Sequence, residues 1–285
     1  MVLTGILFLA FQRSLRKRIL FAMVAVLAVG FVMKYPLVKA LNIGQPDLIE
    51  SLSIPAQQIA RDVTENDDFT DGQKELLEEI VDFEIIPATY TPIISDQIKN
   101  LVREKNNQGY LKEHTGDYIN LYVARALQHP LTYVKAWIDQ TKGYWNAGYG
   151  YWMWIDNVFY NNNGVQRIVR NESLNSVLAR YLFAFQNNRV LNLFISIGFF
   201  DWILLVAFFI GIIQRDRIGI LLTIPCIMNV CTLLIATPVY SDIRYNYAVF
   251  CSIPFILGVI LRSGRLQKGG EAEDGQNCST DPVLE

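Results

Sequence analysis

A short polar loop between two apolar stretches carries the residues best suited to binding a phosphate. The loop reads Pro238-Val-Tyr-Ser-Asp-Ile-Arg-Tyr245, and Asp242 and Arg244 are its only charged residues. A guanidinium can hold a phosphate through two parallel N–H···O bonds. Arg244, Tyr240 and Asp242 are therefore candidate contacts for a lipid phosphate. A headgroup anchor, or an Arg–Asp pair confined to the loop, explains the same residues.

A second candidate is Asp201, the one charged residue in the apolar stretch 190–213. A carboxylate inside a membrane span costs roughly 2.5–3.5 kcal/mol on insertion scales. We therefore expect this intramembrane polar side chain to face protein or water rather than lipid. Two interpretations stay open: a functional carboxyl, or a position near the outer membrane surface if the span begins late, at Phe199.

Three of the five tryptophans, Trp145, Trp152 and Trp154, lie in the aromatic segment Gly143–Trp154. Aromatic faces stack on the C–H surfaces of sugars, and Trp and Tyr also anchor proteins at membrane interfaces. The segment is thus either a ligand contact, for a sugar or a lipid, or an interfacial belt or local core.

Other signatures of chemistry are missing from the sequence. His114 and His129 are too far apart in sequence to form a metal-ligand pair, and there is no phosphate-binding glycine loop, nucleophile elbow or zinc-protease helix. Asp67 and Asp68 are best read as loop acids ahead of a helix, where they complement its dipole. We predict no metal site and no evident cofactor.

Composition narrows the class of protein further. Hydrophobic residues make up 52% and charged residues 18%, and the net charge of −2 offers no basic field for nucleic acid. The four cysteines are Cys226, Cys231 and Cys251, in apolar runs, and Cys278, in the tail. None falls in the polar domain 44–189, which excludes a disulfide framework or a Cys-ligated zinc there.

The residues above must be positioned by membrane helices. A crossing needs ~20 apolar residues, range ~17–25. We predict four transmembrane helices, at 19–41, 190–213, 218–239 and 245–262. A further apolar run, Val2–Phe11, is too short to cross alone and would fit the end of a truncated helix.

Basic residues indicate the orientation, because Lys and Arg accumulate in cytoplasmic segments. They cluster before the first span, between the second and third, and after the fourth, at Arg13, Arg16, Lys17, Arg18, Arg215, Arg217, Arg262, Arg265 and Lys268. The sequence predicts a cytoplasmic N-terminus (1–18), an extracytoplasmic domain (44–189) and a plasma-membrane location. An alternative reads Val38–Ala40 as a signal-peptide cleavage site.

The extracytoplasmic domain should be mainly α-helical. Thr70 with Gln73 forms a capping-box pattern, and Pro130 suits the first turn of a helix. Further helices are expected from Ser95, from Asp117 and over Glu172–Phe185. Residues 263–285 are polar and are predicted to be a disordered cytoplasmic tail.

Several short motifs, in their order and spacing, resemble a known group of proteins. They are Ser53-Ile-Pro-Ala-Gln-Gln-Ile-Ala-Arg61, Tyr90-Thr-Pro, Ser95-Asp-Gln-Ile-Lys99, Gly143-Tyr-Trp145 and Tyr240-Ser-Asp-Ile-Arg-Tyr245. From about residue 19 to 262 the chain is similar to uncharacterised bacterial multi-span membrane proteins related to C-type glycosyltransferases. The resemblance implies a polyprenyl-phosphate sugar donor, an inverting transfer on the outer face and, by resemblance alone, a divalent metal.

The same resemblance implies that this chain lacks the part of the enzyme that carries the catalytic acid. Such enzymes carry their catalytic acid in an early outer loop, which nothing here matches, so no catalytic residue is assigned. The leading hypothesis is the C-terminal part of a glycosyltransferase for cell-envelope glycan, inactive alone, working with membrane lipid and a separate N-terminal subunit. The alternative is a membrane-anchored, non-enzymatic domain that binds glycan or protein; a transporter has less support.

Overall fold

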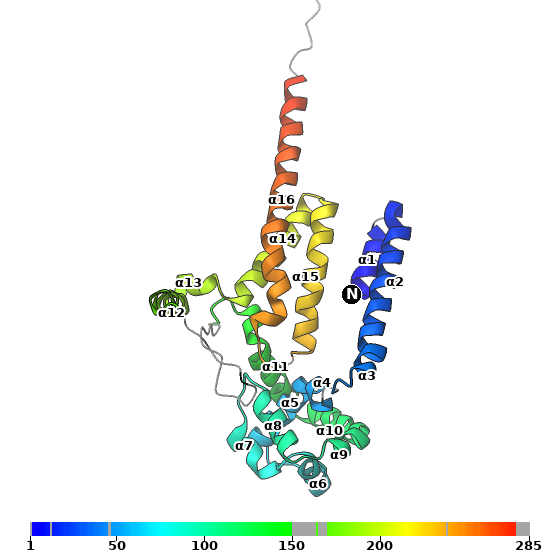
Figure 1. The fold of residues 1–285 in the computed structure, drawn as a ribbon, viewed down its shortest axis with the longest axis vertical. Helices are drawn as coiled ribbons and strands as arrows, with labels where there is room; N and C mark the ends of the chain where they lie inside the picture. The colour runs from blue at the N-terminus through cyan, green and yellow to red at the C-terminus, as the bar shows by residue number, and fades with distance from the viewer. Residues whose placement is uncertain are drawn as a thin grey trace, which may run out of the picture.

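The computed structural model describes residues 2–11, 13–44, 47–149, 164, 170–237 and 239–277. Within these ranges the side chains of residues 2–4, 7, 11, 13 and 263–277 are not described. Every regular element in these ranges is a helix. Two apolar units, a helical hairpin and a three-helix bundle, stand side by side above a globular helical domain (Figure 1). The predicted all-helical membrane class agrees with this architecture.

The hairpin pairs α1 (Val2–Phe11) with α2 (Arg16–Val32), joined by a 3₁₀ turn, η1 (Arg13–Leu15). Beyond α2 the helix continues through a π-helical turn containing Pro36, η2 (Met33–Leu37), into α3 (Val38–Ala40). We call this continuous helical segment, Arg16–Ala40, the rod. Proline removes one ladder hydrogen bond, which accounts for the wider turn. The rod Arg16–Ala40 is long and apolar enough to cross a membrane, near the first predicted span. A signal-peptide cleavage site at Val38–Ala40 remains the alternative to a retained membrane anchor.

The bundle consists of α14 (Ile197–Ile213), α15 (Arg217–Ile235) and α16 (Ile243–Asn277). Its core is formed by apolar side chains from all three helices, including Leu204, Ala207, Cys226, Val249, Ile253, Ile256 and Ile260. Among the described residues, three helices reach the length and hydropathy of a membrane span: the rod, Arg217–Ile235 and Ile243–Arg262. The second predicted span, 190–213, corresponds to α14, an apolar helix that is shorter, at 17 residues.

The predicted second span, 190–213, differs from the structure at its start. Residues 189–193 form a separate short helix, α13 (Arg189–Leu193), and α14 begins only at Ile197. The Asn188 side chain caps α13 by accepting from the backbone of Val190 and Leu191, and Asn192 donates to the carbonyl of Gln186. These local hydrogen bonds compete with a continuous helix, which apolar composition alone did not reveal.

Residues 263–277 of the predicted disordered tail are helical, whereas residues 278–285 lie outside the described residues. Helix α16 runs on from the apolar stretch to Asn277. A helix that has already formed extends at low cost, since each added residue brings one hydrogen bond.

The helical domain comprises α4 to α11, within the predicted region 44–189. Their bounds are α4 (Leu48–Ser51), α5 (Ser53–Glu65), α6 (Asp71–Ile80), η3 (Phe83–Ile85), α7 (Ile86–Thr89), α8 (Asp96–Glu104), α9 (Gln108–Glu113), α10 (Thr115–Gln128) and α11 (Pro130–Trp145). Thr70 and Gln73 form the predicted capping box, and Pro130 opens α11 as expected. The apolar faces of these helices enclose one core, which includes Ile59, Leu77, Ile98, Leu111 and Tyr133.

Helix α12 (Glu172–Asn187) does not join this core: none of its residues is buried. It is seen end-on beside the bundle in Figure 1, so its axis runs across the bundle axis. The helix expected over Glu172–Phe185 is therefore present, but it is separate from the packed domain.

Candidate functional site

The loop between α15 and α16 is held against the helical domain. We call residues 239–242 the bundle loop. Ser95 donates from both its backbone N and its Oγ to the carbonyl of Val239, each at 3.0 Å. The backbone N of Gly143 donates to Ser241 Oγ at 3.2 Å. Because a Cβ at Gly143 would collide with the side chain of Ser241, α11 can approach the loop this closely only with glycine there.

Arg244 follows this loop as the second residue of α16. Its Nε lies 2.9 Å from Asp242 Oδ2, and Asp242 Oδ1 accepts from the Arg244 backbone N at 3.0 Å. The guanidinium lies 4.8 Å from the centroid of the Tyr245 ring. The side chain nevertheless remains 61% exposed, so the Arg–Asp pair within the loop leaves a cation open to solvent or headgroups.

Tyr240, the third loop candidate, is half-buried beside these residues. Burial, with the neighbouring Asp242 carboxylate, raises the pKa of the Tyr240 phenol. The phenol therefore stays neutral at physiological pH, where its hydroxyl can both donate and accept a hydrogen bond.

Asp201 lies in the first turns of α14 and faces the interior of the bundle, with 5% of the residue exposed. Its Oδ1 accepts a 2.7 Å hydrogen bond from Asn246 Nδ2 on α16. Asn229 on α15 in turn donates to Asn246 Oδ1 at 3.3 Å and to the Tyr245 carbonyl at 3.1 Å. A chain of polar side chains thus ties the three bundle helices together, and its α16 member, Asn246, is two residues after Arg244.

The second oxygen of Asp201, Oδ2, has no hydrogen-bond partner in the described part of the chain. Asp201 lines a cavity of about 210 Å³ between α11, α14 and α15. The other lining residues are Tyr144, Trp145, Trp202, Leu204, Leu205, Ile227, Val230, Cys231 and Leu234. The structure therefore brings together two sequence candidates, Asp201 and Trp145, that had been considered apart.

The remaining candidates do not join this cavity. Arg244, Tyr240 and Asp242 are absent from its described lining. Trp145 is fixed against the bundle, because its carbonyl accepts from Trp202 Nε1 at 2.7 Å. Trp152 and Trp154 lie outside the described residues.

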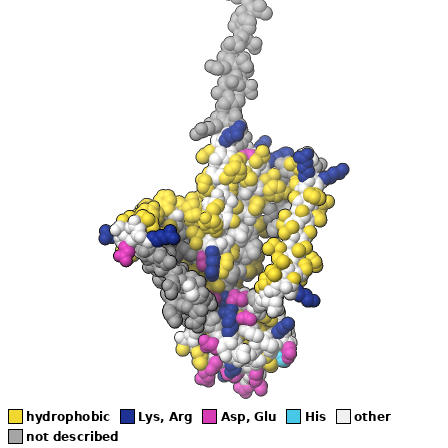
Figure 2. All heavy atoms as spheres, viewed as in Figure 1, with side chains coloured by type: hydrophobic (Ala, Val, Ile, Leu, Met, Phe, Trp, Pro, Cys, Tyr) yellow, Lys and Arg dark blue, Asp and Glu magenta, His cyan; other side chains and the backbone are white. Residues whose placement is uncertain are grey.

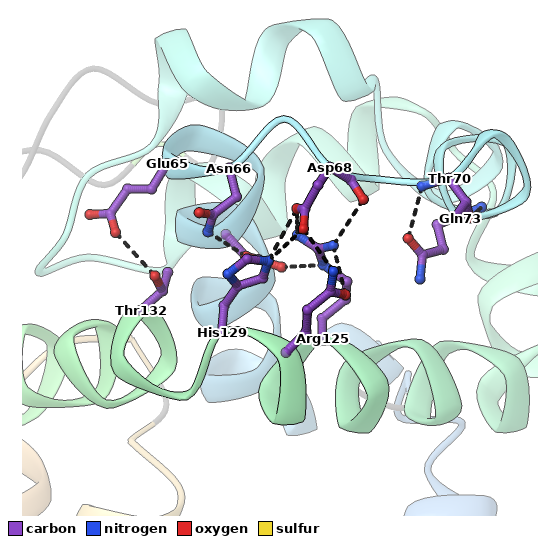
Figure 3. A network of polar contacts seen from close by, with 10 residues as sticks. Glu65, Asn66, Asp68, Thr70, Gln73, Arg125, His129 and Thr132 are labelled. Carbon is purple, nitrogen blue, oxygen red and sulfur yellow. Dashed lines mark hydrogen bonds and ion pairs between the residues drawn. The ribbon is translucent and has the colours of Figure 1, made fainter.

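A second polar cluster, inside the helical domain, centres on Arg125 (Figure 3). Its Nε lies 2.6 Å from Asp62 Oδ2, its Nη2 lies 2.8 Å from Asp68 Oδ1, and its guanidinium lies 3.7 Å from the Phe69 ring centroid. His129 Nε2 is 3.0 Å from the other Asp68 oxygen. The hydrogen bond from Arg125 holds the pKa of the Asp68 carboxyl below its usual range.

This cluster was missed at the sequence level, where Asp68 was interpreted as a loop acid complementing a helix dipole. The available signal was Arg125 itself, a base between Ala124 and Ala126 on a helix with an apolar face. Both Arg125 and Asp62 are fully buried and fully paired, which is typical of a structural ion pair.

No group of three or more His, Cys, Asp or Glu side chains that could hold a metal occurs within the described ranges. The divalent metal implied by resemblance therefore finds no donor set there.

Comparison with known proteins places the chain in a family without giving an activity. A family model described as "Family of unknown function (DUF6020)" matches residues 1–274. The chain belongs to DUF6020. This match carries no link to glycosyltransferases, so that part of the resemblance remains a prediction. No curated protein and no solved structure matches this DUF6020 member.

Proposed function

We propose that this DUF6020 member is a multi-pass protein of the plasma membrane that binds a lipid-linked sugar phosphate at the outer surface. In this proposal it takes part in cell-envelope glycan assembly, resembles the C-terminal part of a glycosyltransferase and transfers no sugar by itself. A separate N-terminal subunit would supply the catalytic acid.

The observation that carries the proposal is the exposed guanidinium of Arg244 at the helical-domain end of the bundle. The Asp242 pair engages Nε, and the side chain is 61% exposed. An arginine fixed at Nε presents its outer edge to a planar pair of phosphate oxygens. The neighbouring Tyr240 and Tyr245 rings supply apolar faces of the kind that stack on sugars.

Charge distribution supports the outward orientation of this end. In Figure 2, Lys and Arg side chains gather at the bundle end away from the helical domain, and acidic side chains are concentrated on the domain. Cytoplasmic segments are enriched in Lys and Arg. The helical domain and Arg244 then face outward.

The surroundings of two carboxylates in the helical domain, Asp68 and Asp96, support a role without catalysis by this chain alone. Asp68 is paired with Arg125, and Asp96 lies 2.7 Å from the buried ammonium of Lys99. A catalytic base needs access to substrate and a pKa near working pH. The pairing and the lowered pKa of Asp68 are the opposite of that requirement.

The test is a binding titration of a polyprenyl-phosphate hexose with the full chain in nanodiscs. A hydrogen bond to a charged group contributes roughly 1.5–3 kcal/mol, so Arg244→Ala should weaken binding about tenfold or more. Arg244→Lys should recover only part of the affinity, and Asp242→Asn should not weaken it. Arg217→Ala is the matched control, since Arg217 is an exposed arginine at the opposite end of the bundle. Equal affinities for Arg244→Ala and wild type would refute the proposal.

A further inference from the structure

The bundle contains a second candidate binding site, independent of Arg244. It is the cavity of about 210 Å³ whose described lining contains one charged residue, Asp201, and is otherwise almost entirely apolar. Asp201 is 5% exposed, and its Oδ2 has no hydrogen-bond partner among the described residues. A buried polar atom left unpaired costs about 1–3 kcal/mol, so a ligand that satisfied it would gain from doing so.

The cavity opens on the lateral surface of the bundle, the side that would face lipid, rather than in the bundle core. Trp202 and Cys231, on α14 and α15, line it and are exposed, whereas Leu204 at its back is buried. On the domain side it is closed by Tyr144 and Trp145 at the end of α11. In a membrane this flank meets acyl chains, so a ligand would enter sideways from the lipid.

The chemistry of the unpaired oxygen selects the polar group of that ligand. A hydroxyl can donate to a carboxylate and can also accept from a carboxylic acid, so it satisfies Oδ2 in either protonation state. An ammonium can only donate, and a phosphate would be repelled by a carboxylate. We propose that the Asp201 cavity binds the hydroxyl end of a lipid alcohol, with Oδ2 as its hydrogen-bond partner.

The size of the cavity fits one end of such a molecule and not the whole. Typical pockets for complete small ligands measure about 300–1,000 Å³. A volume of about 210 Å³ accommodates the hydroxyl and the first carbons, while the rest of the chain lies along α14 and α15 among the lipid tails. The exposed side chains Trp202 and Val206 on α14 offer apolar surface for that remainder.

Two native cysteines allow the proposal to be tested without introducing new reactive residues. Cys231 lines the cavity, and Cys251, on α16, is also exposed but does not line it. The full chain in detergent is treated with N-ethylmaleimide, and modification of each cysteine is followed by peptide mass spectrometry. At decanol about ten times its dissociation constant, modification of Cys231 should slow about tenfold, since only the empty cavity reacts. Cys251 should be unaffected.

Three comparisons decide the result. Undecane, which matches decanol in length but neither donates nor accepts a hydrogen bond, should protect Cys231 less than about twofold at the same concentration. Asp201→Ala should lose protection to the same extent. Val230→Phe, which fills the cavity and leaves Asp201 and Asn246 in place, should abolish the protection of Cys231 by decanol. This variant tests the proposal even if Asp201→Ala does not fold.

Equal protection by alcohol and alkane, equal slowing of both cysteines, or full protection in Val230→Phe would overturn the proposal. Arg244→Ala should leave the protection by decanol unchanged. Failure of phosphate binding at Arg244 and failure of alcohol binding at Asp201 are thus distinguished by separate variants and separate ligands.

Discussion

At the scale of single residues, the strongest constraint in the helical domain is the pair between Arg125 and Asp62. Both side chains have no exposed surface. Breaking a buried pair leaves an uncompensated charge and costs about 3–5 kcal/mol, whereas replacing both partners by apolar groups is often neutral. The net attraction between the two charges therefore contributes less to stability than the cost of leaving either charge buried without its partner.

This gives a double-substitution prediction. Arg125→Met should lower the free energy of unfolding of the full chain by about 3–5 kcal/mol, and adding Asp62→Leu should restore part of it. Thermal and denaturant unfolding in detergent would measure both changes. Arg103→Ala is the control: its pairs with Asp47 and Glu50 are partly exposed, so the loss should stay below about 1 kcal/mol. A double variant less stable than Arg125→Met would contradict the interpretation.

The residue candidates also indicate how far sequence reasoning reaches. Thr70 with Gln73 could be recognised because a capping box joins neighbours in sequence. The partners of Arg125 lie 63 and 57 residues away, and nothing local in the sequence encodes that pairing. Asp201 was singled out from its apolar surroundings alone, but its partner Asn246 and its cavity depend on how three helices pack.

At the scale of elements, the seating of α11 on the bundle loop depends on Gly143. A Cβ there would meet the Ser241 side chain and the Tyr149 ring. The steric cost of this contact should exceed the stabilisation that replacing glycine with alanine usually gives in a helix.

We therefore expect Gly143→Ala to destabilise the chain by about 1–3 kcal/mol, the range seen for overpacking. Gly116→Ala, on α10, is the matched control: its added Cβ meets nothing within 4 Å, so the change should be neutral or stabilising by up to about 1 kcal/mol. The measurement is the thermal midpoint of each variant in the same detergent. Identical midpoints for both variants would mean that α11 can shift to absorb the methyl group.

Element boundaries were the least predictable part of the fold. The spans near 19–41, 218–239 and 245–262 followed from runs of apolar residues and reappear in the structure with small shifts. The start of α14 did not follow, because Asn188 and Asn192 divert the backbone through side-chain hydrogen bonds that hydropathy does not register.

At the scale of the whole molecule, the proposed orientation can be tested with single cysteines. A cysteine at Asn106, in the helical domain, should react with a membrane-impermeant thiol reagent in intact cells, and one at Gln276, at the far end of α16, should react only after lysis. The reason is the accumulation of Lys and Arg at the bundle end away from the helical domain. Labelling of position 276 and protection of position 106 would reverse the orientation and place Arg244 on the cytoplasmic side.

The contact between Ser95 and Val239 has a consequence for how the protein is made. It joins positions 144 residues apart. At about 5–20 residues per second, a ribosome needs roughly 7–30 s to synthesise the second partner after the first. During that interval the domain surface around Ser95 cannot contact the bundle loop, because the loop has not yet been synthesised. Packing of the helical domain on the bundle is therefore a late event in biogenesis. A chain arrested before α15 would expose that surface to chaperones and proteases, which makes the completed bundle loop a natural checkpoint for quality control.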